Sequence, residues 1–298
     1  MSIVTTGFFD GVHLGHRHVI ETVVSCARER GQEAVVVTFW PHPRTVLQQD
    51  ARDFRILTTL EEKRRMLLAM GVDRVEVIPF TRSFAALTAR EYLHLLKDKY
   101  DASVIVMGYD NRIGSDKQTF REIKSSGFLP VFPDERPVLT SSSGNLAFFP
   151  DGGAISSTAV RKSLLAGDVE AANAMLGYEY EMTGAVVAGN RLGRTIGFPT
   201  ANMQLYEPLK LVPGNGVYCV DVEVLGAKYR GMCNIGMRPT VGGVTRTIET
   251  HILDFDQDIY GLPLTLHFAR RIRDERKFDS LDALKEQLEI DKAACRCF

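Results

Sequence analysis

The pattern of apolar residues changes once along this chain, and the change divides the sequence into two differently built halves. Before residues 178–182, short apolar stretches alternate with amphipathic helical stretches. After them, apolar and polar residues alternate with a period of two, which is typical of strands that bury one face. Strands that alternate with helices predict an α/β domain, whereas consecutive alternating strands predict an antiparallel barrel. We therefore expect one domain over residues 1–179 and a second over residues 180–298.

The first half predicts a doubly wound, Rossmann-like parallel sheet. Its strand-like stretches are mostly continuous and apolar, as expected of strands that are buried on both faces. Gly31 and Gly71 follow two of the helical stretches, at a position where glycine commonly ends a helix. Ligands of such sheets bind beyond the carboxyl ends of the strands. The expected strands are 3–6, 34–39, 72–80 and 102–107, and the expected helices are 17–30, 60–70 and 89–100.

The second half predicts a small antiparallel β-barrel that ends in a helix. Two short helices, over residues 159–166 and 168–176, are expected to precede the barrel. Turn residues, mostly glycines, separate the alternating stretches, which is typical of strands joined by hairpins. The expected strands are 216–224, 228–234, 245–255 and 262–273, and the terminal helix is expected over 280–294.

Composition excludes several classes of protein. The 298 residues carry a formal net charge of −1, so no basic field indicates nucleic acid. No apolar run approaches the ~18 residues of a membrane span, and we see no secretory leader. The five cysteines are scattered and lack the spacing of a zinc set, which indicates reduced thiols. We therefore expect a cytoplasmic protein that acts on small molecules, whose oligomeric state the sequence does not give.

The most informative motif lies where the first expected strand meets the first expected helix. It reads Gly7-Phe-Phe-Asp-Gly-Val-His-Leu-Gly-His16, so two histidines flank Gly15. Backbone N–H groups, the positive end of the helix dipole and histidine side chains can all bind phosphate there. The spacing His13-Leu-Gly-His16 also matches the H-x-G-H pattern of nucleotidyl transferases. Two polar residues at a helix start, or half of a zinc site, are the alternative interpretations.

A cation is expected to help neutralise a triphosphate bound at this motif. Arg161 is the candidate, because it lies one turn inside the helix that Ser156, Ser157 and Thr158 open. Asp110 follows an expected strand end, where an acidic residue fits either a nucleotide contact or a plain turn.

A second candidate site lies in the barrel half, in Gly193-Arg-Thr-Ile-Gly-Phe-Pro-Thr-Ala-Asn202. The segment lacks the lysine of a Walker A loop. Pro199 fixes the backbone before Thr200, and Thr200 and Asn202 offer oxygen ligands suited to Mg²⁺. The alternative is a glycine- and proline-containing loop between two strands.

Glu249 is the candidate partner of this segment. It faces away from Ile248 and Ile252 in an expected strand, where glutamate is disfavoured. A carboxylate near a magnesium-bound phosphate could accept the proton of a hydroxyl group. The alternative is a glutamate that faces solvent.

In their order along the chain, these motifs resemble the bacterial bifunctional riboflavin kinase / FMN adenylyltransferase family. The likeness covers nearly the whole sequence. It is carried by residues 7–16, 38–43, 155–161, 197–202, 234–240, 249–251 and 273–278.

The resemblance implies an N-terminal nucleotidyltransferase domain and a C-terminal riboflavin kinase barrel. Such a chain phosphorylates riboflavin to FMN with ATP and Mg²⁺, and then adenylylates FMN to FAD with release of pyrophosphate. The implied catalytic residues are Glu249, as the general base of the kinase, with His13 and His16 at the other site. The implied phosphate-binding residues are Gly7, Phe8, Asp10, Gly15, Ser157, Thr158, Arg161, Gly193, Pro199, Thr200 and Asn202, of which Thr200 and Asn202 also hold Mg²⁺.

One segment departs from the family pattern. Asp110 and Arg112, the expected flavin contacts, remain, but Asn111 and Ile113 stand at positions that are aromatic in many relatives. The departure motivates an alternative in which only the kinase works and the first domain is inactive. A nucleotide or flavin sensor without turnover is a further alternative, against which Glu249 and the paired histidines argue.

Overall fold

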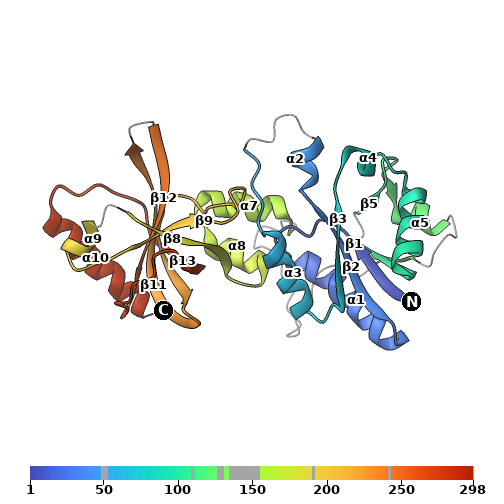
Figure 1. Cartoon of the computed structure of the whole chain (residues 1–298), viewed down its shortest axis with the longest axis horizontal. Helices are drawn as coiled ribbons and strands as arrows, with labels where there is room; N and C mark the ends of the chain where they lie inside the picture. The colour runs from blue at the N-terminus through green and yellow to red at the C-terminus, as the bar shows by residue number, and fades with distance from the viewer. Residues whose placement is uncertain are drawn as a thin grey trace. The chain divides into compact units, whose positions relative to one another are not determined.

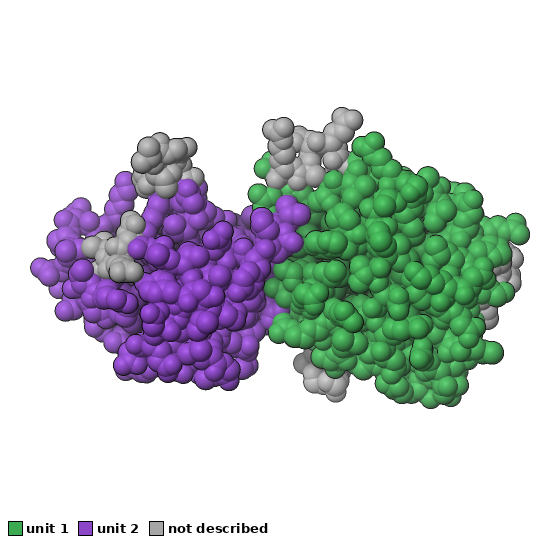
Figure 2. Space-filling view, viewed as in Figure 1, with its two compact units in different colours: residues 1–157 green, residues 158–298 purple. Residues whose placement is uncertain are grey.

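A computed structural model describes residues 1–47, 53–108, 111–125, 131–133, 155–189, 192–240 and 243–297. The chain divides into two units, Met1–Ser157 and Thr158–Phe298 (Figure 2). The two short helices that precede the barrel therefore group with the second unit. The domain boundary expected after residue 179 concerns the two functional domains and stays a prediction.

The first unit is built on a parallel sheet, which confirms the predicted doubly wound architecture. Its strands follow the order β3-β2-β1-β4-β7, and each neighbouring pair is parallel. The chain moves from β1 to β2 on one side and later to β4 on the other, so the strand order reverses beside β1. Such a reversal leaves a crevice at the carboxyl ends of the strands. The strands are β1 (Ser2–Thr6), β2 (Glu33–Trp40), β3 (Arg74–Pro79), β4 (Ala102–Met107) and β7 (Val131–Pro133).

Helices cover both faces of this sheet (Figure 1). Ile3 packs with Val23 and Ala27 of α1, whereas Val4 belongs to the cluster that includes Leu93 of α5 on the opposite face. Successive residues of one strand thus contribute to two cores, which explains why these strands are apolar throughout. The helices are α1 (Leu14–Arg30), α2 (Pro43–Leu47), α3 (Leu60–Ala69), α4 (Arg82–Ala85), α5 (Ala89–Tyr100) and α6 (Phe120–Ser125), and a short hairpin joins β5 (Arg112–Ile113) to β6 (Gln118–Thr119).

The second unit contains a closed barrel in the order β10-β11-β12-β9-β8-β13, with every pair antiparallel. The predicted barrel is therefore confirmed, although the sequence pattern indicated four of its six strands. The strands are β8 (Tyr180–Val187), β9 (Ala201–Leu205), β10 (Gly216–Val224), β11 (Ala227–Thr240), β12 (Gly243–Ile252) and β13 (Pro263–Arg273). The helices are α7 (Ser157–Ala166), α8 (Val169–Leu176), α9 (Leu192–Thr195) and α10 (Leu281–Arg296).

The terminal helix α10 packs against the outside of the barrel. Cys295 of α10 lies in an apolar cluster with Phe198 and Met232, and a disulfide joins it to Cys219 of β10. The expectation of reduced thiols is wrong for this pair. The two cysteines are 76 residues apart in sequence, and only the packing of α10 on β10 brings their Cα atoms to 5.2 Å.

Within the described residues, no helix is both long enough and apolar enough to cross a membrane.

Candidate active sites

The turn between β1 and α1 carries the paired histidines. His13 caps α1, because its Nδ1 accepts the backbone N–H of His16 at 3.3 Å. The two imidazole rings stack with centroids 3.6 Å apart. A Cβ atom on Gly15 would lie 3.2 Å from the His13 ring, so the glycine between the histidines leaves room for the stack. The H-x-G-H spacing thus places both imidazoles at the positive end of a helix.

The same turn has a strained backbone that buried polar groups hold in place. Phe9 and Val12 have φ angles of 52° and 35°, in the left-handed region that side chains disfavour. The buried Asp10 carboxylate accepts the N–H groups of Leu57 and Thr58 at 2.9 and 3.1 Å. Asp10, predicted to bind phosphate, thus anchors the turn to the chain before α3.

A buried cation that the sequence analysis missed lies beside this turn. Lys63 of α3 is fully buried, and its ammonium group donates to the Phe8 carbonyl at 2.6 Å. Burial lowers the pKa of Lys63 to about 8, although Asp10 acts in the opposite direction. Burial, together with nearby His13 and Lys63, holds the pKa of His16 well below its usual range. His16 is therefore neutral at neutral pH.

A cavity of about 480 Å³ opens at the carboxyl ends of β1, β2 and β4. Gly7 and Phe8 line it from the β1–α1 turn, Pro43 follows β2, and Asn111 and Arg112 follow β4. Residues that follow three different strands thus line one cavity, whereas His13 and His16 are not among its lining residues. Aromatic side chains supply much of the remaining wall, from Phe39, Phe80, Phe84 and Tyr92.

The two residues that depart from the family pattern have structural roles here. Asn111 lines the cavity and donates from Nδ2 to the Thr6 carbonyl at the end of β1, at 3.2 Å. Ile113 is buried in the core on the α5 face of the sheet. Arg112 is exposed and also lines the cavity. Asp110 lies outside the described residues.

The residues expected to bind the triphosphate from α7 fall on both sides of the division into units. Ser157 donates from Oγ to the Asp10 carbonyl at 2.8 Å, so it lies at the β1–α1 turn. Thr158 and Arg161 occupy the first turns of α7 and belong to the second unit. Their roles stay predictions.

In the barrel, Glu249 lies in a row of polar residues across three strands. It pairs in register with Asn202 of β9 on one side and with Asn234 of β11 on the other. The Glu249 side chain is 12% exposed, and its carboxylate lies 2.6 Å from the guanidinium group of Arg238. Asn234 and Arg238 were not singled out in the sequence, although both belong to a segment that carries the family resemblance.

The segment between β8 and β9 folds over this row. The Gly193 carbonyl accepts the N–H groups of Ile196 and Phe198, and a Cβ atom at Gly193 would meet the Phe198 oxygen at 2.1 Å. A Cβ atom at Gly189 would lie 2.2 Å from the Asn202 amide. The sequence of residues 193–202 predicts either a binding segment or a loop. The structure places α9, a turn and the start of β9 there.

His251 fixes the end of this segment. Its Nδ1 donates to the Pro199 carbonyl at 2.8 Å, immediately before Thr200. Burial lowers the pKa of His251, and the hydrogen bond to Pro199 only partly opposes that effect. Pro199, which this hydrogen bond to His251 holds in place, thus sets the position of Thr200.

Two cavities meet at Thr200. One, of about 240 Å³, is lined by Thr200, Glu249 and Arg238 together with apolar side chains that include Phe198 and Leu288. The other, of about 390 Å³, is lined by Thr200 and by residues of the segment that follows β12, among them Phe255 and Tyr260. This arrangement suits two substrates that react where their cavities join, with the Glu249 carboxylate on one side of the junction.

Comparison with known proteins matches the two ends of the chain to two different family models. A family model described as FAD synthetase matches residues 1–127, and one described as riboflavin kinase matches residues 176–298. A bifunctional riboflavin kinase/FMN adenylyltransferase of Bacillus subtilis is 36% identical over 98% of this chain and 90% of its own length. The Escherichia coli K12 protein of the same name is 38% identical over 99% and 92%. This chain belongs to the bifunctional riboflavin kinase/FMN adenylyltransferase family.

The resemblance inferred from the sequence motifs is thereby confirmed. A crystal structure from Streptococcus pneumoniae, titled a macrolide-efflux protein, has a TM-score of 0.89 to this chain at 36% identity. It covers all of this chain and 94% of its own. The fold of this member of the bifunctional family therefore matches a solved structure along its whole length.

The FAD synthetase match includes the paired histidines, Lys63 and the whole wall of the 480 Å³ cavity. The riboflavin kinase match includes Thr200, Asn202, Glu249 and both cavities of the barrel. Each half of this chain thus carries its own candidate site.

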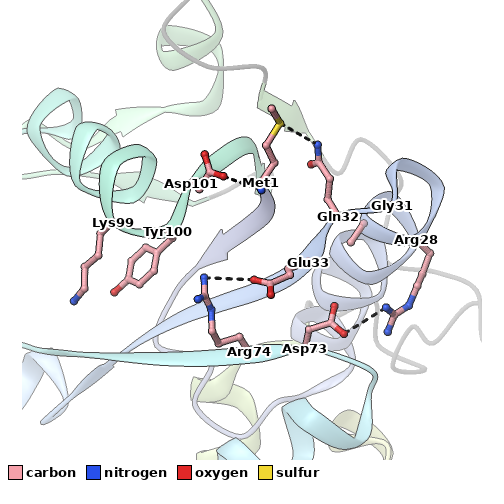
Figure 3. A pocket seen from close by; sticks show the side chains of 11 residues that line it. Met1, Arg28, Gly31, Gln32, Glu33, Asp73, Arg74, Lys99, Tyr100 and Asp101 are labelled. Atoms are coloured by element: carbon pink, nitrogen blue, oxygen red, sulfur yellow. Dashed lines mark hydrogen bonds and ion pairs between the residues drawn. The ribbon is translucent and has the colours of Figure 1, made fainter.

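A further cavity, of about 760 Å³, lies at the opposite edge of the parallel sheet, where the strands begin (Figure 3). Its charges largely pair with one another. Arg28 faces Asp73 at 3.4 Å, Arg74 faces Glu33 at 3.6 Å, and the terminal amino group of Met1 faces Asp101 at 2.8 Å. None of the predicted site residues lines this cavity.

Proposed function

We propose that this chain makes FAD from riboflavin in two steps, with a kinase site in the barrel and an adenylyltransferase site on the parallel sheet. The observation that supports this most is that one chain carries both matched segments, and that each contains a cavity lined by residues of its expected motif. ATP, riboflavin and FMN are the proposed small-molecule substrates, and we propose the cytoplasm as the location.

In the kinase step, riboflavin occupies the cavity beside Glu249 and ATP the cavity on the other side of Thr200. An alcohol is a poor nucleophile at neutral pH, so a base must accept its proton. The Glu249 carboxylate takes the proton of the 5′-hydroxyl group while that oxygen bonds to the γ-phosphorus. The bond between the γ-phosphorus and the oxygen that links it to the β-phosphate breaks, and ADP leaves. The Arg238 guanidinium group orients the carboxylate.

The donor set around Asn202 fits Mg²⁺. Thr200 and Asn202 offer neutral oxygens, and Glu249 is the register partner of Asn202 on the neighbouring strand β12. Among the described residues, no cluster of three or more His, Cys, Asp and Glu side chains could hold a metal. Mg²⁺ commonly takes a few protein oxygens, with phosphates and water completing its shell. When bound, Mg²⁺ would neutralise charge on the phosphates, and the protein side chains named here would hold it.

In the adenylyl step, a phosphate oxygen of FMN bonds to the α-phosphorus of ATP, and pyrophosphate leaves. The nucleophile is already ionised at pH 7, so this site needs no general base. It needs groups that stabilise negative charge on the phosphates. We propose that His13 and His16, the N–H groups of the β1–α1 turn and Ser157 do this, together with Thr158 and Arg161. The flavin would occupy the aromatic-walled cavity, with Arg112 and Asp110 as contacts.

The alternative of an active kinase with an inactive first domain is not favoured. Asn111 and Ile113 motivated it, yet Asn111 ties the loop after β4 to β1 and Ile113 fills the core. The flavin cavity keeps aromatic walls without them.

Two substitutions test the division of labour. We expect Glu249→Gln to abolish FMN formation from riboflavin and to leave conversion of FMN to FAD within about twofold. We expect His16→Ala to do the reverse, because the transition-state charge loses a donor, with a fall of roughly a hundredfold or more. Products separated by chromatography after incubation with ATP and Mg²⁺ give both rates.

Glu286→Gln and His94→Ala, at exposed positions of α10 and α5, are the matched controls. A folded Glu249→Gln or His16→Ala variant that lost both activities would overturn the assignment of two separate sites.

A further inference from the structure

Lys63 is a buried charge that neither proposed step uses. It has no exposed surface, and a charged group is costly to bury unless it is bonded. Its ammonium group donates to the Phe8 carbonyl at 2.6 Å and to Thr38 Oγ1 at 3.1 Å, and it lies 3.7 Å from the centroid of the Phe8 ring. All three contacts lie at the β1–α1 turn or at the adjacent strand β2. The lysine is therefore bound to the turn that carries the histidines.

The turn needs such support because of its conformation. Phe9 and Val12, which follow Phe8, have positive φ angles that only surrounding contacts can maintain. The Asp10 carboxylate holds the far side of the turn through the backbone of residues 57–58. Thr38 Oγ1 donates to the Phe8 carbonyl at 3.2 Å, so Lys63 and Thr38 together hold the near side.

We propose that Lys63 is a positioning residue for FMN adenylylation: its ammonium group fixes the β1–α1 turn through the Phe8 carbonyl and places a buried positive charge beside the histidines. This proposal rests on the proposed adenylyltransferase function. Asp10 acts on the Lys63 charge, and the titratable groups that share its surroundings are His13 and His16. Among the described residues, His16 Nδ1 is buried without a hydrogen-bond partner. Because His16 is neutral beside the Lys63 cation, the site does not carry excess positive charge before a triphosphate binds.

Lys63→Met in the full chain tests this role, since methionine retains much of the length of lysine and removes the charge. We expect kcat/KM for FMN adenylylation to fall at least tenfold, with the riboflavin kinase rate unchanged in the same molecule. The wild-type adenylylation rate should decline above about pH 8 as Lys63 loses its proton, following its lowered pKa. That decline should be absent from the variant.

Arg64→Met is the matched control, because it removes a neighbouring exposed charge from α3. It should keep the wild-type rate and pH profile. If Lys63 had a purely structural role, the Lys63→Met variant would unfold at a lower temperature, and its adenylylation rate would still decline above about pH 8 as in the wild type.

Lys63→Gln serves if Lys63→Met does not fold, because glutamine can still donate to the Phe8 carbonyl without a charge that titrates. A folded Met or Gln variant whose adenylylation profile matches the wild type from pH 7 to 9 would overturn the proposal. Failure of the wild-type protein to convert FMN to FAD would instead overturn the proposed function.

Discussion

At the scale of single residues, the surroundings of His16 disfavour its protonation. The pKa of His16 is lowered chiefly by burial, then by His13 and Lys63. The unfolded chain has an ordinary imidazole with a pKa near 6.5. Below that pH the unfolded state binds a proton that the folded state does not, so the free energy of unfolding falls as the pH falls. Above pH 6.5 this contribution to stability is fully present.

We therefore expect the first unit to unfold at a lower temperature at pH 5 than at pH 7, and His16→Gln to narrow that difference. Trp40, the one tryptophan of the chain, lies at the end of β2, so its fluorescence reports unfolding of the first unit. The control is His94→Gln at an exposed position of α5. An undiminished difference in the His16→Gln variant would show that His16 titrates normally in the folded protein.

The histidines could be predicted from the sequence because H-x-G-H is a local pattern at a strand-to-helix turn. Lys63 could not be predicted, because it lies 47 residues after His16 on a helix of ordinary amphipathic pattern. Nothing local distinguishes a lysine that packing will bury from the exposed arginines beside it. Arg238 was missed for the same reason, since its ion pair with Glu249 depends on the register of two long strands.

At the scale of elements, the segment between β8 and β9 determines where Thr200 lies. A Cβ atom at Gly193 would lie only 2.1 Å from the Phe198 oxygen, so the observed turn requires glycine at this position. We expect Gly193→Ala to displace the segment and lower the rate of riboflavin phosphorylation about tenfold or more, with FMN adenylylation unchanged in the same molecule. Rates measured with riboflavin or with FMN as the starting substrate separate the kinase activity from the adenylylation activity. An unchanged kinase rate would mean that this turn does not position the phosphates.

The sequence pattern located most elements to within a few residues, including α5, β4 and β10 at their observed bounds. It did not indicate β8 and β9, the strands that complete the barrel. β9 has five residues and directly follows the glycine- and proline-containing segment, and β8 coincides with the expected domain boundary. Long, strongly periodic strands can be predicted from a pattern, but short strands are fixed by the neighbours with which they pair.

At the scale of the whole molecule, two separately built cores carry two chemically different sites. A parallel sheet presents loops at its strand ends, and in the proposed function its N–H groups and imidazoles stabilise phosphate charge. The barrel presents a row of side chains on its wall, and in the proposed function its Glu249 carboxylate accepts a proton. One family model matches residues 1–127, which contain the first site, and another matches residues 176–298, which contain the second. Each unit should therefore work when the other is inactivated, with FMN released by one site and bound by the next.

Mixing the two inactivated variants tests this account most directly. Glu249→Gln and His16→Ala, each alone, are supplied with riboflavin, ATP and Mg²⁺, and then both are combined in one reaction at equal concentration. We expect no new flavin from the first, FMN alone from the second, and FAD from the mixture. A mixture of folded variants that yields no FAD would contradict two independent sites that exchange free FMN.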